Sequence, residues 1–191
     1  VMHIGHIEVQ IDSLLSIHGV KNIVTKINKL HIESKKVLSN EKKIVAPLFE
    51  DTSFNNITLK ELVKTSELTY EGQIMSHCVG GYSYSIRDGV SRILSVVGNN
   101  TRGTLQLSKR GSGNGKYTCQ QFLSYNNSEP PKELWEALYL FSLNFEQHME
   151  LQGIIKTVSR KLNNNLILDL CKEHNPELYD DVEAIIEYMT T

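Results

Sequence analysis

Cysteine, proline and long apolar runs are scarce in this chain of 191 residues. Its three cysteines, Cys78, Cys119 and Cys171, lie far apart and form no CxxC pair, so the sequence holds neither a disulfide framework nor a zinc-ribbon motif. No apolar run approaches the roughly 18–20 residues of a membrane-spanning helix. We therefore expect no structural metal, no cofactor and no membrane association, and the cysteine usage predicts a reducing, cytoplasmic location.

The first residues lack the basic and then apolar layout of a secretion signal. Because Val1 precedes Met2, we expect further sequence upstream of Val1. A strong excess of one charge is missing as well: 20 Lys and Arg against 22 Asp and Glu leave a formal net charge of −2. This balance argues against a dedicated polyanion binder, because such proteins usually carry a basic excess.

What is present is an ordinary globular composition, with 40% hydrophobic and 22% charged residues, enough to bury a core. The early part of the chain has a helical pattern, since apolar residues recur at spacings of three and four over residues 20–30. Thr58 and Glu61 match the capping box and predict the start of a short helix. A second helix is predicted over residues 66–89, with its buried stripe at Leu68, Met75, Val79, Tyr82 and Ile86.

Three runs with strand character follow, at residues 92–97, 103–108 and 117–123. The short connections between them favour an antiparallel meander. Pro130 and Pro131 begin another helix, and Asn163 and Pro176 punctuate the final helical pieces. The predicted fold is α+β: helix-rich ends around a central helix packed on an antiparallel meander of three strands or more. The expected parts are an N-terminal helical segment (1–57), a core (58–150) and a C-terminal helical segment (151–191).

The run that begins at Glu71 has the pattern EG-x-x-M-x-HCV-x-x-Y-x-x-x-I-x-x-G. Together with Thr104-Leu105, Gln121 and Asn126, it resembles the central motif of the PcfJ-like proteins of conjugative plasmids and other mobile elements. The resemblance covers roughly residues 58–145. It implies a protein of a bacterial plasmid or phage-related locus, with a site at these residues: Glu71, His77, Cys78, Tyr82, Gln121 and Asn126.

Two positions depart from the family pattern. The family tends to have an acidic residue where this chain has Gln106, and often a glycine before the asparagine, where this chain has Ser124-Tyr125. If the acidic residue is catalytic in the relatives, the activity is lost here.

On a regular helix, with about 100° between residues, His77 would point away from the buried stripe and could not pair with Cys78. Gly80 and Gly81 each cost about 1 kcal/mol of helix stability relative to alanine, which predicts a close approach by backbone or ligand.

Two interpretations of this region are open. In the first, a pocket between the helix and the sheet uses His77 as acid, base or hydrogen-bond donor and Cys78 as nucleophile or wall, while Gln121 and Asn126 hold a neutral polar group. In the second, Cys78 is a small buried hydrophobe, His77 an ordinary helix histidine, Gln121 a strand-end amide and Asn126 a turn former. An accessible or perturbed His77 would favour the first interpretation.

Lys109, Arg110 and Lys116 flank a glycine-rich stretch that lacks the residues of a phosphate-binding loop, so a hairpin loop is expected, although these side chains could contact phosphate. His3 and His6 lack a nearby carboxylate or cysteine and predict no metal site. The sequence thus predicts an enzyme or ligand-binding domain for an unidentified small ligand. The alternative is a non-catalytic accessory that docks to a protein or nucleic-acid partner in DNA transfer or defence.

Overall fold

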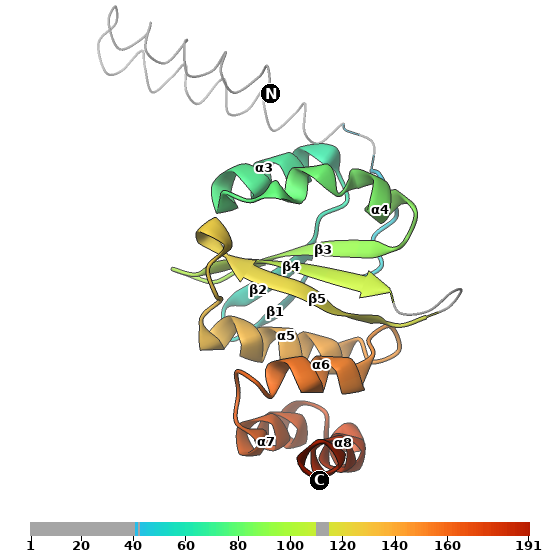
Figure 1. Cartoon of the computed structure of the whole chain (residues 1–191), viewed down its shortest axis with the longest axis vertical. Coiled ribbons are helices and arrows are strands. Elements are labelled where there is room, and N and C mark those ends of the chain that lie inside the picture. The colour runs from blue at the N-terminus through green and yellow to red at the C-terminus, as the bar shows by residue number, and fades with distance from the viewer. Residues whose placement is uncertain (1–40, 42, 110–114) are drawn as a thin grey trace, which may run out of the picture. The chain divides into compact units, whose positions relative to one another are not determined.

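The computed structural model describes Glu41, residues 43–109 and residues 115–191. The predicted helix at 20–30, the His3 and His6 pair and Arg110 lie outside these residues. Lys43–Thr191 form one unit, in which helices cover both faces of a single sheet (Figure 1).

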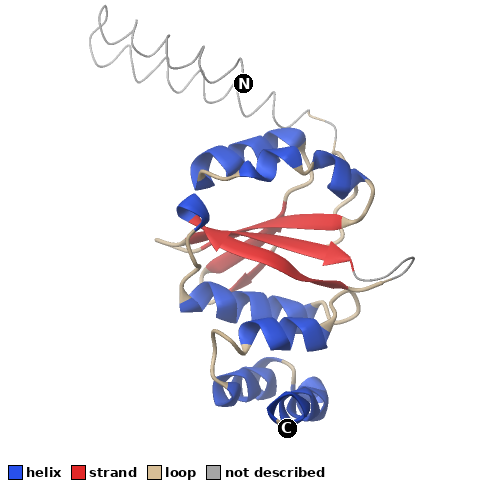
Figure 2. Cartoon of the chain, in the orientation of Figure 1, coloured by secondary structure: helices blue, strands red, loops and turns tan. Residues whose placement is uncertain are grey.

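The sheet has five antiparallel strands in the order β1-β2-β3-β4-β5. Figure 2 shows the sheet in red between layers of helices in blue. The three predicted strands are confirmed. They are β3 (Ser91–Val97), β4 (Arg102–Lys109) and β5 (Tyr117–Ser124). Two shorter strands, β1 (Thr52–Phe54) and β2 (Ile57–Glu61), extend the sheet beyond β3, with β2 paired to β3 and β1 to β2.

The predicted helix start at Thr58 is wrong, because Thr58 lies in strand β2. Residues 57–61 alternate between buried and exposed, the period of a strand rather than a helix. Asn55 and Asn56, with φ of 47° and 65°, form the tight turn between β1 and β2, a conformation that asparagine tolerates well. The next helix begins only at Thr65, where the Glu67 carboxylate accepts hydrogen bonds from the backbone N–H groups of Val63 and Lys64.

The predicted single helix over 66–89 is also wrong. The chain forms α3 (Thr65–Met75), the 3₁₀ turn η1 (Cys78–Gly81) and the short helix α4 (Ser83–Arg87). The break occurs because Ser76 adopts a left-handed conformation (φ 55°) and His77 is extended.

The predicted packing of this segment on the sheet is confirmed, because its apolar stripe is buried against β3 in one cluster: Leu62, Leu68, Val79, Ile86 and Ile93.

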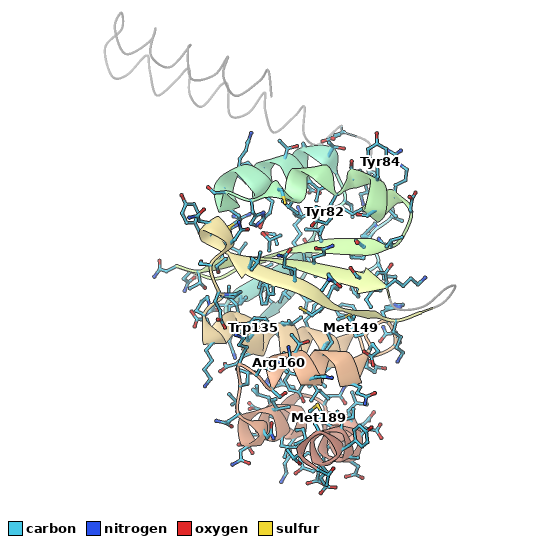
Figure 3. All side chains as sticks on the ribbon, in the orientation of Figure 1. Tyr82, Tyr84, Trp135, Met149, Arg160 and Met189 are labelled. Atoms are coloured by element: carbon cyan, nitrogen blue, oxygen red, sulfur yellow. The ribbon has the colours of Figure 1, made fainter. Side chains whose placement is uncertain are left out.

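The opposite face of the sheet is covered by α5 (Lys132–Asn144) and α6 (Leu151–Val158), beyond which lie α7 (Asn164–His174) and α8 (Tyr179–Thr190) (Figure 1). Two further 3₁₀ turns are η2 (Tyr125–Asn127) and η3 (Pro176–Leu178). The larger core lies on this side. Trp135 of α5 packs edge-on against Phe122 of β5, with ring centroids 4.9 Å apart (Figure 3). The fold is therefore α+β, as predicted.

Candidate functional site

A buried carboxylate lies between α3 and the sheet. Glu71, on the inner side of α3, is 1% exposed. Its Oε2 lies 2.5 Å from Nη2 of Arg102, and its Oε1 accepts a hydrogen bond of 2.7 Å from the Thr104 hydroxyl. Arg102 also donates to Ser95 at 3.1 Å. The cation and the hydroxyl offset the cost of burying this charge, which would be large for a carboxylate without partners.

His77 joins this group through Thr104. The His77 Nε2 lies 3.0 Å from the Thr104 Oγ1. Because the single hydroxyl hydrogen of Thr104 goes to Glu71, the hydroxyl oxygen accepts from His77, and Nε2 must carry the hydrogen. In the neutral ring, Nδ1 is then left as a hydrogen-bond acceptor. Glu71, Thr104 and His77 thus form a continuous hydrogen-bonded chain from the protein interior to a half-buried imidazole.

The prediction that His77 points away from the core is wrong. It assumed a regular helix through residue 77, whereas the break at Ser76 redirects the chain and turns the imidazole towards strand β4. Tyr82 is half-buried and packs against the apolar cluster under α3 and α4. This packing explains why an aromatic residue stands at position 82, with no need of a ligand.

Cys78 begins η1 and is exposed, which contradicts its interpretation as a buried hydrophobe. Its thiol makes no hydrogen bond to any residue that the structure describes. The other two thiols are unsuited to chemistry at neutral pH, since burial raises the pKa of Cys171 and raises the pKa of Cys119 to about 12. Cys78 is thus the accessible cysteine next to His77.

The two predicted amides, Gln121 and Asn126, lie in different places. Gln121 of β5 is the direct partner of Gln106 on β4. Gln106 is two residues from Thr104 and therefore shares its sheet face. Gln121 is exposed on the same face as the His77 chain. Asn126, also exposed, has a left-handed φ of 54° within η2. This conformation matches the turn-forming role considered for it.

Arg102, Thr104 and Gly72 were not predicted as members of the site. Arg102 and Thr104 lie two residues apart on β4 and share a sheet face, but the predicted strand began at residue 103, so only Thr104 could have been found from it. Gly72 is the glycine at a close approach, because a Cβ there would lie 2.9 Å from the His77 carbonyl oxygen. At Gly80 the backbone of α3 does come into contact, since a Cβ there would lie 3.7 Å from the Thr69 Cα, but this is ordinary packing distance. At Gly81 the predicted approach of backbone is wrong, because a Cβ there would meet nothing within 4 Å.

Burial lowers the pKa of His77 below its usual 6.5, while the negative charge of Glu71 and the backbone of His77 act in the opposite direction. We expect an NMR titration to place the midpoint of His77, identified by its loss in His77→Gln, below 6.5. Folding favours the neutral ring, so it contributes to the free energy of unfolding above pH 6.5, the pKa of an unfolded histidine. This contribution is lost as the pH falls from 6.5 through the lower pKa of the folded protein. Glu71→Gln should lower the midpoint further. A midpoint at or above 6.5 in the folded wild-type protein would contradict this assignment.

Two pockets lie beside the turn between β3 and β4. One, of about 260 Å³, is bordered by the turn between β1 and β2 and by α5. The other, of about 580 Å³, is bordered by the end of α3 and by η2. Neither pocket includes His77 or Cys78, so the imidazole lies at a half-buried surface position outside both.

The basic loop is described only in part. Lys109 ends β4, and the exposed Lys116 donates from its Nζ to the carbonyl of Glu146 at 2.8 Å. Contact of these side chains with phosphate stays a prediction.

No family model, no curated protein and no solved structure matches this chain. Within residues 43–109 and 115–191, no three His, Cys, Asp or Glu side chains gather as a metal site would require. In the same part of the chain, no helix has the length and apolar character needed to cross a membrane. The chemistry of the His77 site is therefore the basis on which a function can be inferred.

Proposed function

We propose that this chain is a cytoplasmic PcfJ-like domain of a bacterial mobile element or phage-related locus, and that it binds a small polar ligand at His77. The observation that carries the proposal is the half-buried imidazole tied through Thr104 to the buried Glu71. A perturbed and accessible histidine is what an enzyme or ligand-binding domain requires.

The arrangement supports a specific role for the ring. With Nε2 held by Thr104 and the pKa lowered by burial, the imidazole is neutral at pH 7 and its Nδ1 carries no hydrogen. Such a nitrogen can take a proton from a ligand hydroxyl or amide, as a general base does. Cys78 is the adjacent accessible thiol, and the amides of Gln106 and Gln121 on the same sheet face supply neutral polar contacts.

The alternative function is a non-catalytic accessory that docks to a protein or nucleic-acid partner in DNA transfer or defence. It is favoured by exposed aromatic side chains on the helical cover. Tyr70 of α3 is 59% exposed and Tyr84 of α4 is 71% exposed. Figure 3 shows Tyr84 at the outer side of the helical cover. Aromatic side chains of this kind are enriched at interfaces.

A thermal-shift screen tests the ligand site. The wild-type protein, His77→Gln and a control, His174→Gln on the exposed side of α7, are each melted with a panel of nucleotides and metabolites. A ligand present at a hundred times its Kd stabilises the protein by about 2.7 kcal/mol, which corresponds to a rise in Tm of roughly 5–10 °C. We expect at least one compound to raise the Tm of the wild type and of His174→Gln, and not that of His77→Gln.

Two outcomes would count against the ligand site. In one, folded His77→Gln responds to every compound as the wild type does. In the other, no compound in the panel shifts the wild type. Either result would leave the accessory function as the better interpretation, and the next variants would then be Tyr70→Ser and Tyr84→Ser.

A further inference from the structure

The larger pocket beside the turn between β3 and β4 does not include His77 and shares only Arg102 with its hydrogen-bonded group. Its apolar wall comes from separate elements: Ile74 and Met75 at the end of α3, Val97 at the end of β3, and Tyr125 in η2. The pocket is an open groove and not an enclosed cavity, and its volume of about 580 Å³ lies in the range of roughly 300–1,000 Å³ of small-molecule sites.

Large apolar side chains in this lining remain open to solvent. Ile74 and Val97 are each 36% exposed, and Tyr125 is 62% exposed. Single exposed apolar residues are ordinary, but three that meet at one pocket from a helix, a strand and a turn mark a place where an apolar surface can bind. Tyr125 offers an aromatic face, which suits a flat ring.

Arg102 brings to this pocket a guanidinium group that is already paired with a buried carboxylate. Its Nε and Nη2 face Glu71, and Nη2 also donates to Ser95. Among the residues that the structure describes, Nη1 has no acceptor, so two N–H groups are left unused. Arg102 borders the pocket directly opposite Val97 in the sheet, and its side chain is 28% exposed. Arg102 therefore brings to the pocket wall a guanidinium held by Glu71, with Nη1 not engaged by any residue that the structure describes.

The charges decide which kind of acceptor fits. The guanidinium is already neutralised by Glu71, and the other carboxylate of the lining, Glu129, is paired with Lys161. With no excess positive charge, a neutral carbonyl oxygen suits these donors better than a second anion. The side-chain amides of Asn99 and Asn100 add both donors and acceptors at the rim.

We propose that this pocket binds a planar heteroaromatic ring that bears a carbonyl oxygen, the chemistry of a 6-oxopurine. The ring lies against Tyr125 and the Ile74 and Val97 side chains, and its carbonyl accepts from Nη1 of Arg102. The asparagine amides meet the ring nitrogens. The pocket shares Arg102, and no other residue, with the group formed by Glu71, Thr104 and His77, and the proposal does not require a ligand at His77.

Inosine and adenosine form the matched pair of probes, because they differ at position 6, where inosine has a carbonyl acceptor and adenosine an amino donor. We expect titration calorimetry to give a Kd for inosine at least about tenfold lower than for adenosine, since arginine pairs with a purine O6 and not with an amino group. Tyr125→Ala should weaken inosine binding about tenfold or more through lost stacking. The control Tyr188→Ala, at a residue that is 74% exposed on α8, should bind as the wild type does.

Two further variants separate the contributions. Arg102→Lys keeps the charge beside Glu71 and should remove the preference for inosine; Tyr125→Ala serves where that variant fails to fold, because Tyr125 is a surface residue. His77→Gln should leave inosine binding unchanged. Absence of inosine binding to the wild type, equal affinity for both nucleosides, or full inosine affinity in Tyr125→Ala would each overturn the proposal.

Discussion

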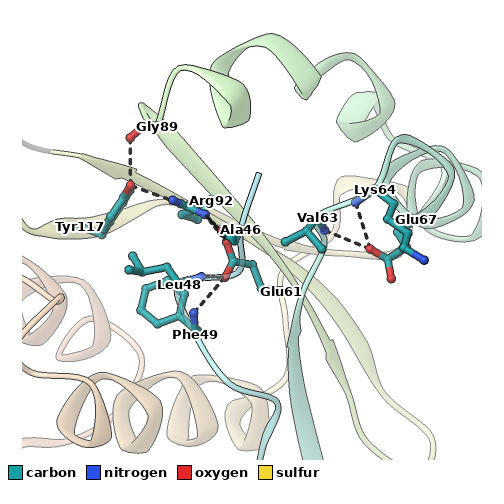
Figure 4. A network of polar contacts seen from close by, with 10 residues as sticks. All are labelled: Ala46, Leu48, Phe49, Glu61, Val63, Lys64, Glu67, Gly89, Arg92 and Tyr117. Carbon is teal, nitrogen blue, oxygen red and sulfur yellow. Dashed lines mark hydrogen bonds and ion pairs between the residues drawn. The ribbon is translucent and has the colours of Figure 1, made fainter. Parts of the chain in front are cut away.

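Replacement of Glu61 by alanine is expected to lower the free energy of unfolding by about 3–5 kcal/mol, the usual cost of breaking a buried ion pair. The Glu61 side chain is 2% exposed and its Oε1 lies 2.8 Å from Nη1 of Arg92. Its Oε2 accepts from the backbone N–H groups of Leu48 at 2.7 Å and Phe49 at 3.0 Å (Figure 4). The substitution therefore leaves a buried guanidinium without its carboxylate and two amides without their acceptor.

The same network explains why the loss should spread beyond β2. Arg92 of β3 also donates to the Ala46 carbonyl at 3.0 Å and to the Tyr117 hydroxyl at 3.3 Å, and Tyr117 donates in turn to the Gly89 carbonyl at 2.9 Å (Figure 4). These contacts tie the segment before β1 and the residues before β3 to the edge strand β5. A cooperative loss of structure, and not local fraying, is the expected consequence.

Thermal unfolding measures the effect, with an expected fall in Tm of roughly 6–20 °C for a chain of this size. The matched control is Lys132→Ala, which breaks the exposed pair between Lys132 and Glu136 at 3.4 Å. Exposed pairs contribute about 0–1 kcal/mol, so this variant should melt near the wild type. A Glu61→Ala protein as stable as Lys132→Ala would show that the network contributes little.

The second large effect is expected at Gly72. Gly72→Ala should destabilise the protein by about 1–3 kcal/mol, the range for an overpacked site, although alanine is the better helix former by about 1 kcal/mol. The new Cβ would lie 2.9 Å from the His77 carbonyl oxygen and 3.4 Å from the Gly80 nitrogen. Both neighbours are backbone atoms, and the His77 N–H is bonded to the Gly72 carbonyl at 3.1 Å, so the contact cannot relax without moving His77.

Gly81→Ala is the control for this substitution. A Cβ at Gly81 meets nothing within 4 Å, and its φ is not in the left-handed region. We expect a change of zero to about +1 kcal/mol in stability, because alanine restricts the unfolded chain. Urea denaturation of both variants measures the difference, and the His77 resonance should shift in Gly72→Ala alone. Equal stability of the two variants would show that η1 can move away from α3 at little cost.

Features set by neighbouring residues were predictable. The strands β3, β4 and β5 follow from local alternation and from the short connections between them. The buried positions of the stripe were also predicted correctly, since Leu68, Val79 and Ile86 are all in the core beneath the helical cover. These side chains are apolar, and that alone favours their burial, even though residues 66–89 do not form the single helix from which the stripe was predicted.

The breaks and the exceptions were not predictable, for a physical reason in each case. Residues 57–61 satisfy both a capping-box pattern and a strand pattern, and pairing of Leu59 with Val96 of β3 decides between them. Ser76 ends α3 in a left-handed conformation that serine seldom adopts, and the residues that disfavour a helix, Gly80 and Gly81, come only four and five positions later. The direction of His77 depends on this break.

The sequence by itself determined the α+β class, the antiparallel meander and the buried stripe, and it singled out Glu71 and His77 as candidate site residues. Only the tertiary structure joined these two residues, through Thr104, and paired Glu71 with Arg102. The pairing links residues 31 positions apart and the hydroxyl contact residues 33 apart. Such contacts depend on which strand passes beneath α3 and in what register, and that is decided by the packing of the whole sheet and not by any local pattern.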